Sequence, residues 1–150
     1  MTGTKERLQE DVKAALRAGN KVRLGVLRMV MAAIKQREVD TRETLDDVAV
    51  LAVLEKMVKQ RQEAITQFER GGRGDLVAKE SAEIDVIREF LPKPLDAAGI
   101  TALLDAAIAA TGATTVADMG RVMAEVKQAA AGRADMAELA KLVRARLGAR

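Results

Sequence analysis

The chain is divided by the hexapeptide Phe90-Leu91-Pro92-Lys93-Pro94-Leu95, which contains both prolines of the 150 residues. Proline has no backbone N–H and restricts the residue before it, so a helix does not continue easily through this stretch. The residues before it are rich in charge, whereas those after it are rich in alanine. The sequence therefore predicts an N-terminal domain over residues 1–91, a proline-containing linker over residues 92–94 and a C-terminal domain over residues 95–150.

Apolar residues recur at helical spacing throughout residues 1–91. The longest pattern alternates steps of three and four residues from Leu51 to Phe68 and ends at Gly71-Gly72, which predicts a helix on the order of 35–40 Å long. Three further helices are predicted beside it, with apolar positions at Leu8, Val12 and Leu16; at Val22, Leu24, Val26, Leu27, Val30, Met31 and Ile34; and at Leu76, Ile84, Ile87 and Leu91. Four such helices predict a bundle-like part.

Residues 95–150 carry three signals for the start of a helix. Asp96 is a candidate N-cap, Thr115-x-x-Asp118 resembles a capping box, and Asp135-x-x-Glu138 starts the last helical pattern. Gly112 and Gly132 follow the first two helical patterns, as glycines that end helices do. These signals predict a small domain of three short helices. Because neither part shows a convincing strand pattern, the sequence predicts an all-α fold.

The side chains that carry most enzyme chemistry are absent from the chain. There is no cysteine and no histidine, and Ser81 is the only serine. This composition excludes disulfides, thiolate metal sites and cysteine nucleophiles. The carboxylates of Glu80, Glu83 and Asp85 are explained better by a solvated helix face than by a bound metal. We therefore expect no catalytic residue, no metal site and no cofactor.

The sequence shows no signal for export or for insertion into a membrane. Its first residues are polar and charged, without the apolar segment that export requires. No stretch approaches about 18 uninterrupted apolar residues. We therefore expect a soluble, cytoplasmic protein that does not bind a membrane.

Arg61 falls on the apolar face of the longest predicted helix, where an unpaired charge would be costly. Two interpretations are open. Either a carboxylate such as Glu83 or Asp85 pairs with Arg61, or the apolar face opens into a cleft at this point. We favour the ion pair.

Between Asp11 and Glu38 the sequence contains no acidic residue but seven basic ones, namely Lys13, Arg17, Lys21, Arg23, Arg28, Lys35 and Arg37. A stretch of one sign can bind phosphates or an acidic partner. Alternatively, acidic residues of the neighbouring helices pair with it in the fold. Its candidate residues for RNA binding are Lys21, Arg23, Arg28 and Lys35.

A second group of basic residues lies on the predicted C-terminal helices, at Arg121, Lys127, Arg133, Lys141 and Arg144. Three short helices are too small to bury these side chains, so we expect a basic surface; a solvated surface without a ligand is the alternative. The only aromatic residues, Phe68 and Phe90, fall at expected core positions. RNA would therefore be bound through phosphates, 2′-hydroxyls and shape, not by stacking of unpaired bases.

Two groups of motifs resemble the GatB/YqeY family. Asp118-Met119-Gly120-Arg121-Val122-Met123 and Gly132-Arg133-Ala134-Asp135 are similar to the tail domain of the B subunit of the tRNA-dependent amidotransferase. Lys21-Val22-Arg23-Leu24, Lys59-Gln60-Arg61-Gln62-Glu63 and Leu91-Pro92 resemble free-standing YqeY proteins. The resemblance runs through essentially the whole chain. It implies an all-α protein with a bundle-like N-terminal part and a small three-helix C-terminal domain.

The resemblance implies a non-catalytic tRNA-binding accessory module related to tRNA-dependent amidotransferases. Its expected partners are a tRNA and an amidotransferase or an aminoacyl-tRNA synthetase. Arg121 and Arg133 match basic positions of the family motif, so the resemblance places them in contact with RNA, and Lys127 follows them. The chain departs from the family at Met136-Ala137, where Gly-Lys is usual, and this change weakens the RNA interpretation at the start of the last helix.

Two other functions stay open. One is a protein-binding adaptor that uses the basic stretch over residues 13–37. The other is a carbon–nitrogen ligase with glutamine as the amide donor, as descriptions of the family imply. Release of ammonia from glutamine commonly needs a cysteine nucleophile or a serine activated by a base. Since Ser81 falls mid-helix without such a neighbourhood, we expect no intrinsic activity.

Overall fold

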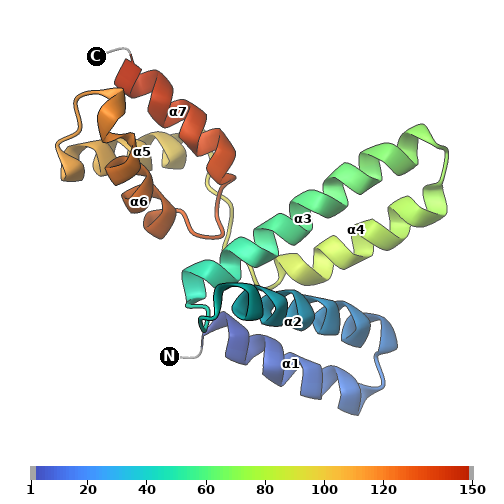
Figure 1. Ribbon diagram of the computed structural model, residues 1–150. Coiled ribbons are helices and arrows are strands. Elements are labelled where there is room, and N and C mark those ends of the chain that lie inside the picture. The colour runs from blue at the N-terminus through green and yellow to red at the C-terminus, as the bar shows by residue number, and fades with distance from the viewer. Residues whose placement is uncertain (1–2, 149–150) are drawn as a thin grey trace. The chain divides into compact units, whose positions relative to one another are not determined.

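The computed structural model describes residues 3–148, which form seven α-helices and one short 3₁₀-helix without a strand (Figure 1). The elements are α1 (Thr4–Ala18), α2 (Lys21–Thr41), α3 (Asp47–Arg70), α4 (Gly74–Arg88), α5 (Ala97–Thr111), η1 (Val116–Asp118), α6 (Met119–Ala129) and α7 (Met136–Gly148). The predicted all-α fold is confirmed.

The chain divides into two compact units, Met1–Pro92 and Lys93–Arg150. Helices α1 to α4 form the N-terminal unit, and α5, η1, α6 and α7 form the C-terminal unit. Independent folding of the two parts stays a prediction.

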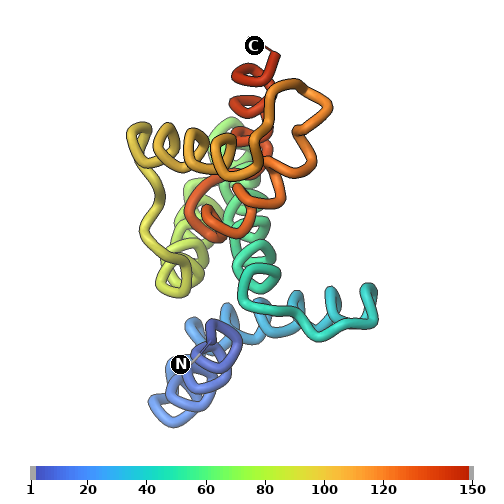
Figure 2. Tube along the Cα trace, turned by 90° about the vertical axis from the view of Figure 1, so that its left-hand side faces the viewer, coloured from blue at the N-terminus to red at the C-terminus, as the bar shows by residue number. Residues whose placement is uncertain are grey.

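The N-terminal unit consists of two helical hairpins. Helix α3 lies beside α4 in both views (Figure 1, Figure 2), and α2 packs against α1, α3 and α4. The turn between α1 and α2 contains Gly19 at φ 69°, and the side chain of Asn20 accepts a hydrogen bond from the backbone N–H of Arg23 at 3.1 Å. All four helices contribute to the core, including the fully buried Leu8, Leu27, Ile34, Leu54 and Ile87.

Two residues that we expected on buried stripes, Leu16 and Val22, are exposed. Leu16 follows Leu8 by two steps of four residues, and each such step advances about 40° around an α-helix. By the last turn of α1 this stripe has left the buried face, and Ala15 is buried instead. Val22 lies in the first turn of α2 and faces solvent, although Val26, one turn further along the same stripe, is buried.

The C-terminal unit has an apolar core of its own. Asp96 caps α5 by accepting a hydrogen bond from the backbone N–H of Gly99 at 2.7 Å, and Leu95 and Ile100 pack against the core. Gly112, at φ 64°, ends α5 in the left-handed conformation that glycine adopts without strain. The buried residues of this core are Leu104, Ala107, Ile108, Ala113, Val122, Val126, Ala130, Leu139, Val143 and Leu147.

Among the described residues, no single helix has both the length and the apolar composition of a membrane span. Helix α5 and the segment Val116–Ala129 have this length and composition only when they are taken together, and a bend of 93° separates them.

Candidate nucleic-acid interface

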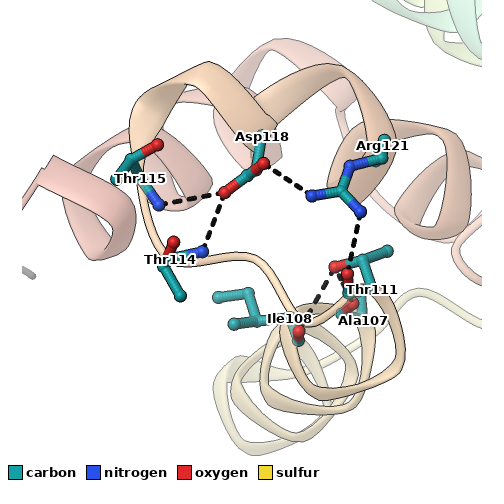
Figure 3. Close-up of polar contacts among 7 residues, drawn as sticks. All are labelled: Ala107, Ile108, Thr111, Thr114, Thr115, Asp118 and Arg121. Carbon is teal, nitrogen blue, oxygen red and sulfur yellow. Dashed lines mark hydrogen bonds and ion pairs between the residues drawn. The ribbon is translucent and has the colours of Figure 1, made fainter.

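Arg121 lies near the start of α6 and contacts both η1 and the end of α5 (Figure 3). Its Nη2 donates to Oδ1 of Asp118 at 2.5 Å, and its Nη1 donates to the carbonyl oxygen of Thr111 at 3.1 Å. The second bond satisfies a carbonyl in the last turn of α5, where no further helical N–H group is available. Two elements therefore fix the orientation of the guanidinium group.

Asp118 is itself fixed by backbone donors. One of its oxygens accepts from the N–H of Thr114 at 2.9 Å and from the N–H of Thr115 at 3.1 Å (Figure 3). The N–H of Thr114, the Arg121 guanidinium and the N–H of Thr115 together hold the pKa of the Asp118 carboxyl far below its usual range. The carboxylate thus stays charged and keeps Arg121 in place at physiological pH.

Arg121 is nevertheless accessible to a ligand. Its side chain is 61% exposed despite the two bonds, and the guanidinium has further N–H groups that these bonds leave unused. Arginine presents such groups in a planar fork that matches two oxygens of a phosphate. The Arg121 corner, defined as Thr111, Asp118 and Arg121, is therefore a preoriented donor for an anionic oxygen.

Arg133 lies in the turn between α6 and α7. Its Nε donates to the carbonyl oxygen of Lys93 at 3.0 Å, and its own carbonyl oxygen accepts from the N–H of Leu95 at 2.9 Å. Gly132, at φ 74°, gives the turn the shape that these contacts need. Arg133 therefore joins the first residues of the C-terminal unit to the turn before its last helix.

The remaining basic candidates of this unit are exposed. Lys141 pairs loosely with Glu138 at 3.7 Å, and surface pairs of this kind contribute little. Within residues 3–148 neither Lys127 nor Arg144 has an ion-pair partner. These charges are available to a ligand. Arg146, which lies close to them in sequence, is engaged with Asp105.

The basic side chains do not all follow one helical stripe. Arg121 and Lys127 are six residues apart on α6, which places them about 120° apart around the helix. Lys141 and Arg144 are three residues apart on α7 and so share one side of it. A ligand that contacts all of them must be large enough to reach across α6 and α7.

Arg23, a candidate of the N-terminal group, is engaged within its own unit. It donates to Asp11 on α1 at 2.5 Å and to Glu89, just after α4, at 2.6 Å. The hydrogen bond to Glu89, and then that to Asp11, raise the pKa of Arg23. Arg23 thus ties three segments of the unit together, whereas Lys21, Arg28 and Lys35 are exposed.

Arg61 forms the ion pair that we favoured over a cleft. Its Nε lies 3.0 Å from Oε2 of Glu83 and 4.0 Å from Oε2 of Glu80, and its Nη1 donates to the carbonyl oxygen of Met57 at 3.2 Å. Of the three carboxylates that could have suggested a metal, Glu80 and Glu83 therefore face a guanidinium, and only Asp85 lies on the solvated face that we expected for all three. In the described part of the chain no group of three or more acidic side chains is placed to hold a metal ion.

Sequence reasoning identified Arg121 but missed the groups that orient it. The carbonyl oxygen of Thr111 leaves no trace in a side-chain pattern, and Asp118 was interpreted as a helix cap alone. The spacing of three residues between Asp118 and Arg121 is the one available signal, since side chains so spaced on a helix can pair. The exposed apolar residues of α2 were also missed, because Val22 was assigned to a buried stripe.

Comparison with known proteins establishes the family. The family model described as Yqey-like protein matches residues 5–147. The chain belongs to the YqeY-like protein family. The match includes both units, which confirms the resemblance to free-standing YqeY proteins.

Several curated relatives of this YqeY-like protein are fungal proteins named "Altered inheritance of mitochondria protein 41, mitochondrial". The relative from Eremothecium gossypii is 36% identical over 85 residues, which are 56% of this chain and 46% of the relative. The relatives from Lachancea thermotolerans and Saccharomyces cerevisiae are 33% and 31% identical, again over 56% of this chain and 46% of each relative. The chain thus matches about half the length of each relative.

The expected cytoplasmic location is contradicted by these relatives, because each is named as a mitochondrial protein. The expectation rested on the lack of an apolar export segment. Mitochondrial targeting segments are amphipathic and rich in arginine and serine, so a search for apolar segments is not a test of a mitochondrial location. The expectation was wrong for this reason.

Proposed function

We propose that the C-terminal unit binds tRNA through its phosphate backbone, as an accessory without catalytic activity of its own. The observation that carries the proposal is the Arg121 corner, where Asp118 and Thr111 orient an exposed guanidinium. Arg121 is also, with Arg133, one of the two residues for which the resemblance to the amidotransferase tail domain implies contact with RNA. Geometry and resemblance thus point to the same side chain.

Preorientation favours binding because less side-chain freedom is lost when a phosphate arrives. Lys127, Lys141 and Arg144 add exposed charges that hold the backbone without reading its sequence. The C-terminal unit contains no aromatic residue on which a base could stack. We therefore expect binding with weak sequence selectivity, governed by phosphates and by the shape of the RNA.

The proposed partners are a tRNA and an enzyme that acts on aminoacyl-tRNA, such as an amidotransferase or an aminoacyl-tRNA synthetase. The resemblance supports this choice. On this proposal the chain supplies RNA affinity, while the partner enzyme supplies the chemistry.

The test is the affinity of the full chain for tRNA as a function of salt. Each neutralised phosphate contributes about 0.7–0.9 to the slope of log affinity against log salt, so three to five contacts give a slope of about −2 to −4. Arg121→Gln with Arg133→Gln should weaken binding similarly for different tRNAs and flatten the slope by about one to two units.

Arg146→Gln is the matched control, because it removes a positive charge from the same unit at a side chain already engaged with Asp105. It should change affinity less than Arg121→Gln alone. Equal losses for the two variants would mean that net charge, and not the Arg121 corner, governs binding. Absence of measurable tRNA binding at low salt would overturn the proposal.

A further inference from the structure

Helix α2 carries apolar side chains that its own unit leaves largely exposed, although Sδ of Met29 also lies 3.9 Å from Nη2 of Arg61 on α3. Val22 is 72% exposed, Met29 40% and Val39 58%, while Leu27 and Ile34 of the same helix are fully buried. The exposed residues belong to a series with alternating steps of three and four, which we name the α2 outer face. Its members are Val22, Gly25, Met29, Ala32, Gln36 and Val39, and all are exposed.

This spacing is the one by which a helix pairs with a second helix along a seam. Gly25 lies between Val22 and Met29 on the face, and a Cβ atom built there would meet no heavy atom within 4 Å beyond its chain neighbours and the adjacent backbone of α2. No neighbour within the described residues therefore requires a glycine, although glycine in a helix interior is destabilising relative to alanine. A small residue at this position lets a partner helix approach the α2 backbone closely.

A row of basic side chains borders the α2 outer face at intervals of seven residues: Lys21, Arg28 and Lys35. Within residues 3–148, Lys21 and Arg28 form no ion pair, and Lys35 lies close enough to Glu38 to affect its pKa. No acidic residue occurs between Asp11 and Glu38 to offset the row. The edge of the seam is therefore positive along most of its length.

We propose that the α2 outer face binds an amphipathic helix of a partner protein, whose apolar side chains lie on the seam and whose bordering row is Asp or Glu. The charge on the border selects this occupant, because residues that flank a helical seam determine which partners pair. This interaction surface lies in the N-terminal unit and goes beyond the tRNA binding proposed for the C-terminal unit.

A second copy of the chain does not supply the complementary charge. In an antiparallel pair of α2 helices the two basic rows would face each other. In a parallel pair each row would face the other flank, at Val26, Ala33 and Asp40, where the single carboxylate of Asp40 is the one acidic group. Like charges across the seam therefore disfavour the antiparallel pair, and the parallel pair offers one carboxylate for three basic side chains.

Phosphate binding does not account for the apolar side chains either. Val22 and Val39 can bury no base by stacking, and phosphates gain nothing from aliphatic contacts. RNA phosphates could bind the basic side chains of Lys21, Arg28 and Lys35. The apolar seam beside them is instead complementary to the apolar stripe of an amphipathic helix. RNA and the protein helix respond in opposite directions when the valines become lysines, and this contrast makes the test decisive.

The experiment places a photoreactive benzophenone side chain at Ala32 of the full chain, in cells that produce the protein naturally, and identifies the crosslinked peptides by mass spectrometry. Ala78, an exposed alanine on α4, is the matched control position. We expect crosslinks specific to Ala32, to a helical segment of another protein with apolar residues at steps of three and four and acidic flanks. In the same chain, Val22→Lys with Val39→Lys should lower the crosslink yield about tenfold or more, since the apolar contacts are lost.

Arg28→Glu should also lower the yield, and a partner variant with Lys in place of the facing acid should restore it. The substitutions at Val22, Arg28 and Val39 all lie at exposed positions, so circular dichroism should show an unchanged helix content for each variant. Crosslinks to residues 93–148 of this chain, to a second copy, or at no higher level than from Ala78 would overturn the proposal. Tighter tRNA binding by Val22→Lys with Val39→Lys would overturn it too, by assigning the face to RNA.

Discussion

Arg61 on α3 and Glu83 on α4 form an ion pair between the two helices of the second hairpin, with Nε and Oε2 3.0 Å apart. The two side chains are 13% and 11% exposed. Arg61 also donates to the carbonyl oxygen of Met57 at 3.2 Å, and Glu80 approaches its Nε to 4.0 Å. The pair is thus a connected polar group within an otherwise apolar contact.

Removal of one partner should destabilise this unit strongly. Glu83→Ala leaves a largely buried guanidinium with Glu80 as its remaining carboxylate. Breaking a buried pair costs about 3–5 kcal/mol, and the compensation by Glu80 places our expectation at about 2–4 kcal/mol of unfolding free energy. Urea unfolding monitored by circular dichroism measures this loss.

Replacement of both partners should lower the free energy of unfolding far less than Glu83→Ala does. Arg61→Met with Glu83→Leu removes both charges and keeps apolar volume at the contact, and such exchanges are often neutral or stabilising. A double variant as unstable as Glu83→Ala would show that the pair does more than balance its own charge. A double-mutant cycle separates the two contributions.

The helices were predictable because local signals and packing agree. Asp96 caps α5 as a candidate N-cap should, Asp46 caps α3 in the same way, and glycines end α1 and α5. The burial of individual side chains was predicted less well, because it depends on which side of the helix an apolar stripe has reached at each turn. Leu16 drifts off the buried face of α1, and Val22 faces solvent on α2. A list of apolar positions does not record which face the neighbouring helices cover.

The candidate site was predictable as a set of charges but not as a geometry. The sequence identifies Arg23 and Arg121 equally as arginines in basic stretches. Contacts between distant residues distinguish them: Arg23 is bound by Asp11 and Glu89, while Arg121 keeps an exposed guanidinium. Such pairings over 12, 66 or 10 residues depend on the tertiary fold, which the charge pattern alone does not specify.

The stability of the C-terminal unit should depend on the ionisation of Asp118. Its pKa is lowered in the folded state by the N–H of Thr114, the guanidinium of Arg121 and the N–H of Thr115. The resulting stabilisation is complete above the ordinary carboxyl pKa, near 4, and is lost as the pH falls through the lower folded pKa. The difference in Tm between the wild-type chain and Asp118→Asn should therefore narrow as the pH falls below about 4.

Glu125→Gln provides the control for this measurement, because it removes an exposed carboxylate of the same unit. Its Tm should follow that of the wild-type chain across the acid range. If Asp118→Asn behaves in the same way as Glu125→Gln at every pH, the network around Arg121 does not contribute to stability.

The purified chain should show no glutaminase, ATPase or amide-forming turnover. Ser81, the only serine, lies within α4, and no cysteine is present to attack the amide of glutamine. Ammonia release from glutamine, measured with a coupled assay, tests this expectation. Robust release that Ser81→Ala abolishes would assign catalysis to the chain itself.

The boundary between the two units separates parts of the chain that should fold independently. A fragment that begins at Leu95 should be helical and should melt cooperatively, because the core of the C-terminal unit is formed by its own residues. A fragment that begins at Lys93 should melt at a higher temperature, since it keeps the carbonyl oxygen that accepts from Nε of Arg133 at 3.0 Å. One such hydrogen bond contributes about 0.5–1.5 kcal/mol, a change in Tm that circular dichroism resolves for a domain of this size. Arg133→Ala should remove the difference between the two fragments, and a random-coil spectrum for both would show that the C-terminal unit does not fold alone.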